Sequence, residues 1–171
     1  VKLQVKYLSA NQRRQYEVSI RDGVLRYKNK TGTPLILTDG MRSGHGTANA
    51  AIFVISPDGK WYVRKHEEGK FHHSSFLAGG PVFSAGELKT NTRGEIIYLS
   101  NESGHYRPGA SHLLYAVKDL ETKGKDLREL RLKFLSSKGA TNYDTLIFLQ
   151  RAPNLIKHES EEERASNKLW K

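Results

Sequence analysis

Three short turn sequences constrain the fold of this 171-residue chain more than any other feature. The turn residues are Asp22-Gly23, Pro57-Asp58-Gly59 and Arg93-Gly94. Glycine after aspartate accepts the positive φ angles of tight hairpin turns, and proline presets the first residue of a turn. The flanking segments 16–27, 51–65 and 85–100 are rich in the β-branched and aromatic residues that half-buried strands favour. The sequence therefore predicts three β-hairpins.

A helix and a loop are predicted from the spacing and composition of two other segments. Apolar residues between 111 and 122 recur at helical spacing, Ser111 is a suitable N-cap, and Gly124 is a suitable stop. The segment 31–50 is rich in glycine and small residues, which is typical of a loop.

Two more strands complete the predicted fold. The segment 129–134, "ELRLKF", alternates apolar and charged residues, and the segment 145–149, "TLIFL", is a continuous apolar run. We therefore predict an α+β fold made mainly of antiparallel sheets built from hairpins, with few helices.

The length of the chain suits one domain. We expect this domain over residues 1–155, followed by a polar tail over residues 156–171. The chain begins at Val1 without a leader, which suggests a piece of a longer protein. No apolar run approaches the roughly 20 residues that a membrane span needs, so no membrane partner is expected. The sequence has no cysteine and therefore forms no disulfide.

The charge of the chain is strongly positive. The formal net charge is +10, and the segment 156–171 holds equal numbers of basic and acidic residues, so the excess lies in residues 1–155. Such an excess favours polyanions such as nucleic acids and nucleotides. It is equally compatible with an acidic partner protein or with a merely solubilising surface.

The segment 70–87, "KFHHSSFLAGGPVFSAGE", concentrates residues that could carry chemistry. If the segment is extended, His72 and His73 point to opposite faces, and no spaced carboxylate or cysteine accompanies them, so no metal site is expected. His73 could exchange a proton near neutral pH beside Ser74 and Ser75, which could orient a ribose. The alternative is that one histidine packs in the core while the serines cap a turn.

Glycines and a carboxylate follow the histidines. Gly79 and Gly80 leave the backbone open to close approach by a ligand. Glu87 opens a predicted strand, where it could stabilise a cationic sugar intermediate or accept a proton. The alternatives are a tight strand connection and an ordinary surface glutamate.

The segment 101–109, "NESGHYRPG", combines three further side chains of interest. His105 could exchange a proton, Tyr106 could stack on a base or a nicotinamide ring, and Arg107 could bind a phosphate. The alternative is an ordered turn that the tyrosine anchors.

These segments carry a family resemblance. "KFHHSSFLAGG", the following "AG" and "SGHYRP" resemble the C-terminal domain of the plant IQ-motif-containing calmodulin-binding proteins, over roughly residues 10–110. The chain has no IQ helix, and Glu87 stands where the plant pattern has a basic residue. The pattern also resembles C-terminal toxin domains of bacterial polymorphic-toxin and secreted effector proteins.

The toxin resemblance implies an NAD-dependent ADP-ribosyltransferase with a fold like that of these enzymes. His73 would hold the nicotinamide ribose with Ser74 and Ser75 beside it, while Gly79 and Gly80 would let the cofactor approach. Tyr106 would stack on the nicotinamide, Arg107 would bind a phosphate, and Glu87 would assist transfer.

The same resemblance implies partners and a location. The target would be RNA or a protein, an acidic immunity protein would neutralise the toxin, and the domain would be secreted or delivered into the cytoplasm of a target cell.

Two other functions remain open at the level of sequence. A metal-independent ribonuclease would use His73 and His105 as base and acid, with Glu87 in support and Arg107 stabilising the transition state. A non-enzymatic binding module would use the same loops to recognise a partner.

Overall fold

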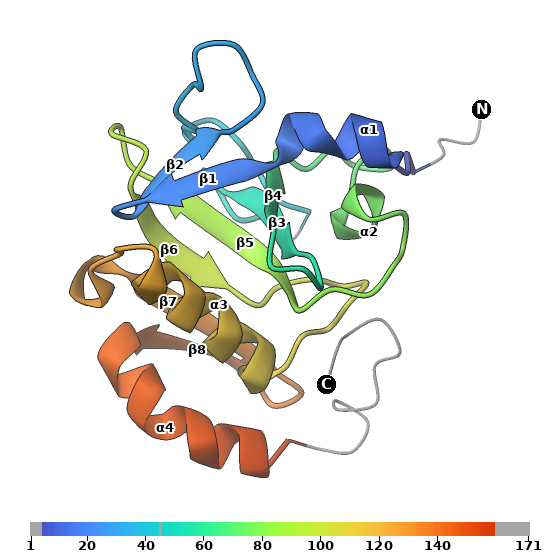
Figure 1. The fold of residues 1–171 in the computed structure, drawn as a ribbon. Helices are drawn as coiled ribbons and strands as arrows, with labels where there is room; N and C mark the ends of the chain where they lie inside the picture. Colours follow the sequence, from blue (N-terminus) through green and yellow to red (C-terminus); the bar gives the residue numbers. More distant parts are fainter. Residues whose placement is uncertain (1–4, 45, 160–171) are drawn as a thin grey trace.

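The computed structural model describes residues 5–44 and 46–159 and shows an α+β fold, as the sequence predicts (Figure 1). In chain order the elements are α1 (Ala10–Arg13), the 3₁₀ helix η1 (Arg14–Tyr16), β1 (Val18–Arg21), β2 (Val24–Tyr27), β3 (Ala51–Ile55), β4 (Trp61–Arg64), α2 (His73–Phe76), β5 (Ser84–Thr90), β6 (Ile96–Ser100), α3 (Ala110–Thr122), the 3₁₀ helix η2 (Leu127–Glu129), β7 (Arg131–Ser136), β8 (Gly139–Asp144) and α4 (Thr145–Lys157).

All three predicted hairpins are present, as β1–β2, β3–β4 and β5–β6. Gly23 and Gly59 have φ angles of 76° and 82°, which explains why glycine follows aspartate at both turns. β1 and β2 form a small sheet of their own, and the remaining strands form a six-stranded sheet in the order β4-β3-β5-β6-β7-β8. β6 and β7 are parallel, and every other neighbouring pair is antiparallel.

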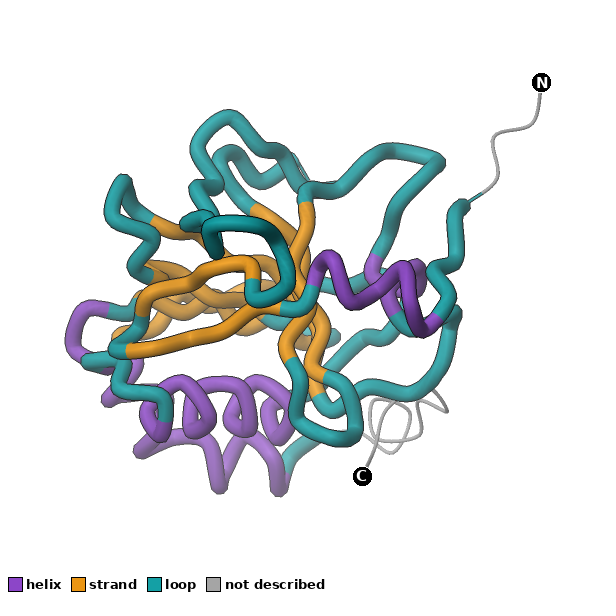
Figure 2. The backbone as a smooth tube through the Cα atoms, turned by 45° about the horizontal axis from the view of Figure 1, so that its top comes forward, coloured by secondary structure: helices purple, strands orange, loops and turns teal. Residues whose placement is uncertain are grey.

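The large sheet is buried on both faces near its centre. Phe53 and Ile55 of β3 belong to a cluster that also contains Leu113 of α3 and Phe148 of α4. Ile52 and Val54 of β3 point to the other face and join a second cluster. Figure 2 shows α3 and α4 together on one side of the strands. β5, which pairs with β3, consequently runs through the interior, and all of its residues except Lys89 are buried.

The predicted strand at 145–149 is wrong, because this segment begins helix α4. Asp144 caps the helix by accepting a hydrogen bond from the backbone N–H of Leu146. Thr145 and Phe148 are buried, whereas Leu146 is exposed, as the helical period requires. An apolar run of five residues fits a buried strand or one side of a helix equally well, and only the cap distinguishes them.

Other local differences from the prediction lie at element ends. The N-cap of α3 is Gly109, so Ser111 lies inside the helix. The strand predicted at 129–134 is present as β7, and the antiparallel strand β8 follows it. α4 extends to Lys157, and the part of the predicted tail beyond Glu159 lies outside the described residues. Within those residues, no helix has the length and apolar character needed to cross a membrane.

Candidate functional site

His73 lies in a short helix rather than in an extended strand. α2 spans His73–Phe76, and Ser75 Oγ accepts a hydrogen bond from the backbone N–H of His72 at 3.0 Å. His73 Nε2 donates to the carbonyl oxygen of Gly86 at 2.6 Å. That nitrogen carries a proton and is committed to the backbone, so it is not positioned to accept another proton.

The two serines beside His73 also have structural contacts. Ser74 and Ser75 are both buried. The backbone carbonyl of Ser74 accepts a hydrogen bond from Gly79, and that of Ser75 accepts one from Leu8. Ser75 therefore caps α2, and the backbone carbonyls of both serines hold neighbouring segments of the chain. This agrees with the alternative interpretation of the sequence, in which the serines cap a turn.

Glu87 is fully buried on β5 and lies next to a second buried acid, Glu102. Glu87 Oε1 accepts a hydrogen bond from Thr47 Oγ1 at 2.9 Å, and Glu102 Oε1 accepts one from Lys133 Nζ at 2.8 Å. The pKa of Glu87 is raised to about 7, mainly because the carboxyl group is buried and also because the Glu102 carboxyl group lies beside it, while hydrogen bonds with Ser43 and Thr47 oppose the shift. Glu87 therefore keeps its proton up to a higher pH than an exposed glutamate does.

Backbone hydrogen bonds fix the position of this acid pair. Ser100 Oγ accepts hydrogen bonds from the backbone N–H groups of both Glu87 and Glu102, each at 3.2 Å. β5 and β6 approach each other so closely here that a Cβ on Gly86 would lie 1.8 Å from the carbonyl oxygen of Ser100. The glycine is thus required by the contact between strands and not by the approach of a ligand.

Tyr106 is completely buried and belongs to the second core cluster. Its hydroxyl group donates to the carbonyl oxygen of Gly80 at 2.8 Å, and burial raises its pKa. The ring therefore presents no free face on which a base could stack. Its neighbour Arg107 is exposed and has a φ angle of 48°, so it turns away from the core.

A cavity of about 290 Å³ brings several histidines together. It is lined by Gly44, His66, Glu68, His72, His73, Gly104 and His105. His73 and His105 thus reach the same cavity from distant segments, as a two-histidine site requires. Within residues 5–44 and 46–159, no three histidine or acidic side chains are arranged to hold a metal ion.

Sequence reasoning identified part of this region and missed the rest. It identified His73, Glu87 and His105 but not Glu102 or Thr47. The β5–β6 hairpin contains the information that could have identified Glu102. Leu88 pairs with Leu99 in this hairpin, so the residues just after Ser100 lie near Glu87. Thr47 comes from the long loop 31–50, and no sequence pattern indicated that this loop folds back over β5.

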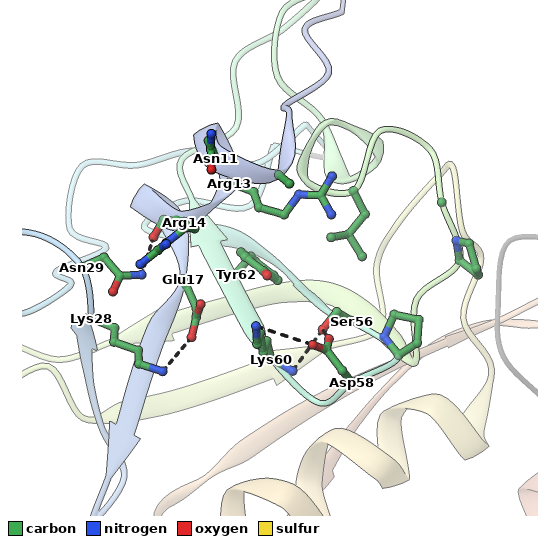
Figure 3. A pocket seen from close by; sticks show the side chains of 15 residues that line it. Asn11, Arg13, Arg14, Glu17, Lys28, Asn29, Ser56, Asp58, Lys60 and Tyr62 are labelled. Carbon is green, nitrogen blue, oxygen red and sulfur yellow. Dashed lines mark hydrogen bonds and ion pairs between the residues drawn. The ribbon is translucent and has the colours of Figure 1, made fainter.

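A second and larger concavity, with a volume of about 670 Å³, lies between α1–η1 and the β3–β4 turn (Figure 3). We call it the arginine groove. Its lining residues are Ala10, Asn11, Arg13, Arg14, Glu17, Lys28, Asn29, Ser56, Pro57, Asp58, Lys60, Tyr62, Leu77, Gly80 and Pro81. Figure 3 shows Arg13 and Arg14 on one side, Asp58 and Lys60 on the other, and Tyr62 between them. Among these residues, only Gly80 was assigned to a functional site from the sequence.

Comparisons with known proteins identify a family. The model for the "IQ motif-containing protein middle domain" matches residues 12–113. The chain is 31% identical over 165 residues to IQ domain-containing protein IQM2 of Arabidopsis thaliana, covering 96% of this chain and 25% of the relative. It is 37% identical over 110 residues to IQM3 of the same plant, covering 64% and 22% of the two chains. The chain thus spans about a quarter of the length of these relatives. No solved structure matches it.

These findings correct the functional prediction. The resemblance to plant IQ-motif proteins is confirmed, whereas a bacterial toxin domain is not supported. The prediction of an NAD-dependent ADP-ribosyltransferase is wrong, and so are NAD as cofactor, RNA as target and an immunity protein as partner, because the family consists of IQ domain-containing proteins. The burial of Tyr106 agrees with this correction, because the predicted stacking on nicotinamide needs an accessible ring.

Proposed function

Because this chain belongs to the family of IQ motif-containing protein middle domains, we propose that it is a non-enzymatic binding module that contacts a protein partner. The observation that carries the proposal is the family match over residues 12–113, which includes Arg13 and Arg14 of the arginine groove, the histidine-lined cavity and Glu87. The relatives are named for the IQ domain, a binding element, and not for a reaction.

The burial of the polar groups near the histidine-lined cavity supports a binding role. Glu87 is fully buried, His73 is 6% exposed, and the hydroxyl group of Tyr106 is hydrogen-bonded to the backbone. Groups that act on a substrate must reach it, whereas these groups hold loops and strands together. These polar groups are buried because β5 packs against β6 and against the loop 31–50, which contacts Glu87 through Thr47.

Calmodulin is the partner that we propose. The family resemblance implies calmodulin-binding proteins, and the net charge of +10 on this chain complements the carboxylate-rich calcium loops of calmodulin. On this chain, the contact would use the surface of the folded domain.

Isothermal titration calorimetry of the folded chain with calmodulin, with and without calcium, tests this proposal. We expect saturable binding that weakens as salt is added, because charge complementarity contributes to it. A parallel incubation with labelled NAD and cell lysate should leave RNA and protein unlabelled. Transfer of the label would overturn the non-enzymatic assignment, and the absence of heat in both calcium states would overturn calmodulin as the partner.

A further inference from the structure

The arginine groove carries more positive than negative charge. Its bases are Arg13, Arg14, Lys28 and Lys60, and its acids are Glu17 and Asp58. Both acids are already engaged by lysines, because Lys28 Nζ lies 3.0 Å from Glu17 Oε2 and Lys60 Nζ lies 3.6 Å from Asp58 Oδ2. The two arginines are therefore the charges that the groove leaves uncompensated.

The guanidinium groups of Arg13 and Arg14 have little to bind within the domain. Arg13 Nη2 makes one long hydrogen bond of 3.4 Å to the carbonyl oxygen of Leu8, and its Nε is buried with no partner among the described residues. Arg14 is exposed, and Asn29 binds only its backbone carbonyl. Guanidinium groups pair most strongly with carboxylates and phosphates, so the groove offers two vacant anion-binding side chains on adjacent residues.

The rest of the lining favours a peptide over a polyphosphate. Leu77 and Pro81 add apolar side chains to the lining of the groove, and so does Tyr62, which is 5% exposed. Glu17 and Asp58 would repel a continuous chain of phosphates, whereas separate carboxylates on a peptide can avoid them. The volume of about 670 Å³ lies in the range of roughly 300–1,000 Å³ that is common for ligand sites.

We infer that the arginine groove docks a segment of a partner protein in which acidic and apolar side chains alternate. This inference rests on the proposed binding function and adds to it a surface and a ligand chemistry. Carboxylates of the segment pair with Arg13 and Arg14, and its apolar side chains contact Tyr62, Leu77 and Pro81.

Fluorescence polarisation with a short labelled peptide of alternating glutamate and leucine tests the inference. We expect the folded chain to bind this peptide and the double variant Arg13→Ala/Arg14→Ala to bind it about tenfold more weakly, because each charge-assisted hydrogen bond contributes substantially. The matched control is Arg93→Ala/Arg128→Ala, which removes the same charge from exposed sites outside the groove. Equal weakening in both double variants would show a general charge effect and overturn the inference.

A second variant, two control ligands and a calmodulin titration complete the test. If the double variant does not fold, the single change Arg14→Glu at an exposed position should still weaken binding. A glutamine-leucine peptide should not bind, and inorganic phosphate at matched ionic strength should not displace the acidic peptide; either result to the contrary would overturn the inference. Calmodulin titrated against the double variant separates the two proposals. If the double variant binds both calmodulin and the peptide as tightly as the wild type does, the groove is rejected as the docking site but the proposed binding function stands. If peptide binding depends on the arginines while calmodulin does not bind at all, only calmodulin is rejected as the partner.

Discussion

The side chains of Glu87 and Glu102 lie next to each other in the interior, although the two residues belong to different arms of the chain on either side of the β5–β6 turn. Two adjacent carboxylates cannot both be charged there at low cost. The pair therefore links the stability of the fold to pH.

Stability should fall as the pH rises from about 4.5 to above 7. The pKa of Glu87 is raised from 4.5 to about 7 in the folded chain, so its contribution is complete below the unfolded value and is lost as the pH rises through the folded value. Glu87→Gln should remove this dependence and stabilise the chain at pH 8 by up to about 3.5 kcal/mol, because the shift of about 2.5 pKa units corresponds to about 1.4 kcal/mol for each unit. Urea unfolding at pH 4, 6 and 8 measures the effect. The control Glu121→Gln, at an exposed position on α3, should keep the wild-type dependence, and a Glu87→Gln profile with the wild-type slope would contradict the assignment.

Tyr106→Phe should lower the free energy of unfolding by about 1 kcal/mol, because the Gly80 carbonyl loses its buried hydrogen-bond donor. Thermal unfolding followed by circular dichroism measures this change. Tyr115→Phe, at a partly exposed position on α3, is the matched control and should have little effect. If the two variants behave alike, the hydroxyl group of Tyr106 has no structural role.

Asp144→Ala should destabilise the chain by about 1 kcal/mol, because α4 loses the side chain that caps it. Asp144→Asn is the informative control, since asparagine also caps helices but cannot form the ion pair with Arg131. We expect Asp144→Asn to retain most of the stability in urea unfolding. A loss as large as that of alanine would assign the effect to the ion pair instead of the cap.

Gly86→Ala should prevent stable folding or cost several kcal/mol, because the added Cβ would lie 1.8 Å from the backbone oxygen of Ser100 and the two strands would have to separate. Gly80→Ala meets only the carbonyl of Leu77, at 3.0 Å, and should cost less. Expression of folded protein and its melting temperature distinguish the two variants. A Gly86→Ala chain as stable as the wild type would show that β5 and β6 are not in such close contact.

The hairpins were predictable because each depends on a few adjacent residues. Asp22-Gly23 specifies its turn whatever the rest of the chain does. The helix at 145–157 was missed because its first five residues are equally compatible with a strand, and the decisive signal is the single cap Asp144. Local patterns are reliable only where one conformation clearly dominates.

The polar residues were harder to interpret. The sequence marked His73, Glu87 and Tyr106 as reactive, yet the structure buries all three and engages them in hydrogen bonds within the fold. Arg13 and Arg14 were not among the predicted site residues, although they line the larger groove. Residue type indicates which chemistry is available, but accessibility decides whether a partner can use it.

The amino-acid sequence by itself determined the turns, the class of fold, the excess of positive charge and the family, because these depend on residue identity and on neighbours along the chain. Only the tertiary structure decided that Glu87 meets Glu102 and Thr47 in the interior while Arg13 and Arg14 face an open groove. The physical reason is that burial, and with it the pKa and the accessibility of a side chain, is set by atoms that distant segments bring into contact.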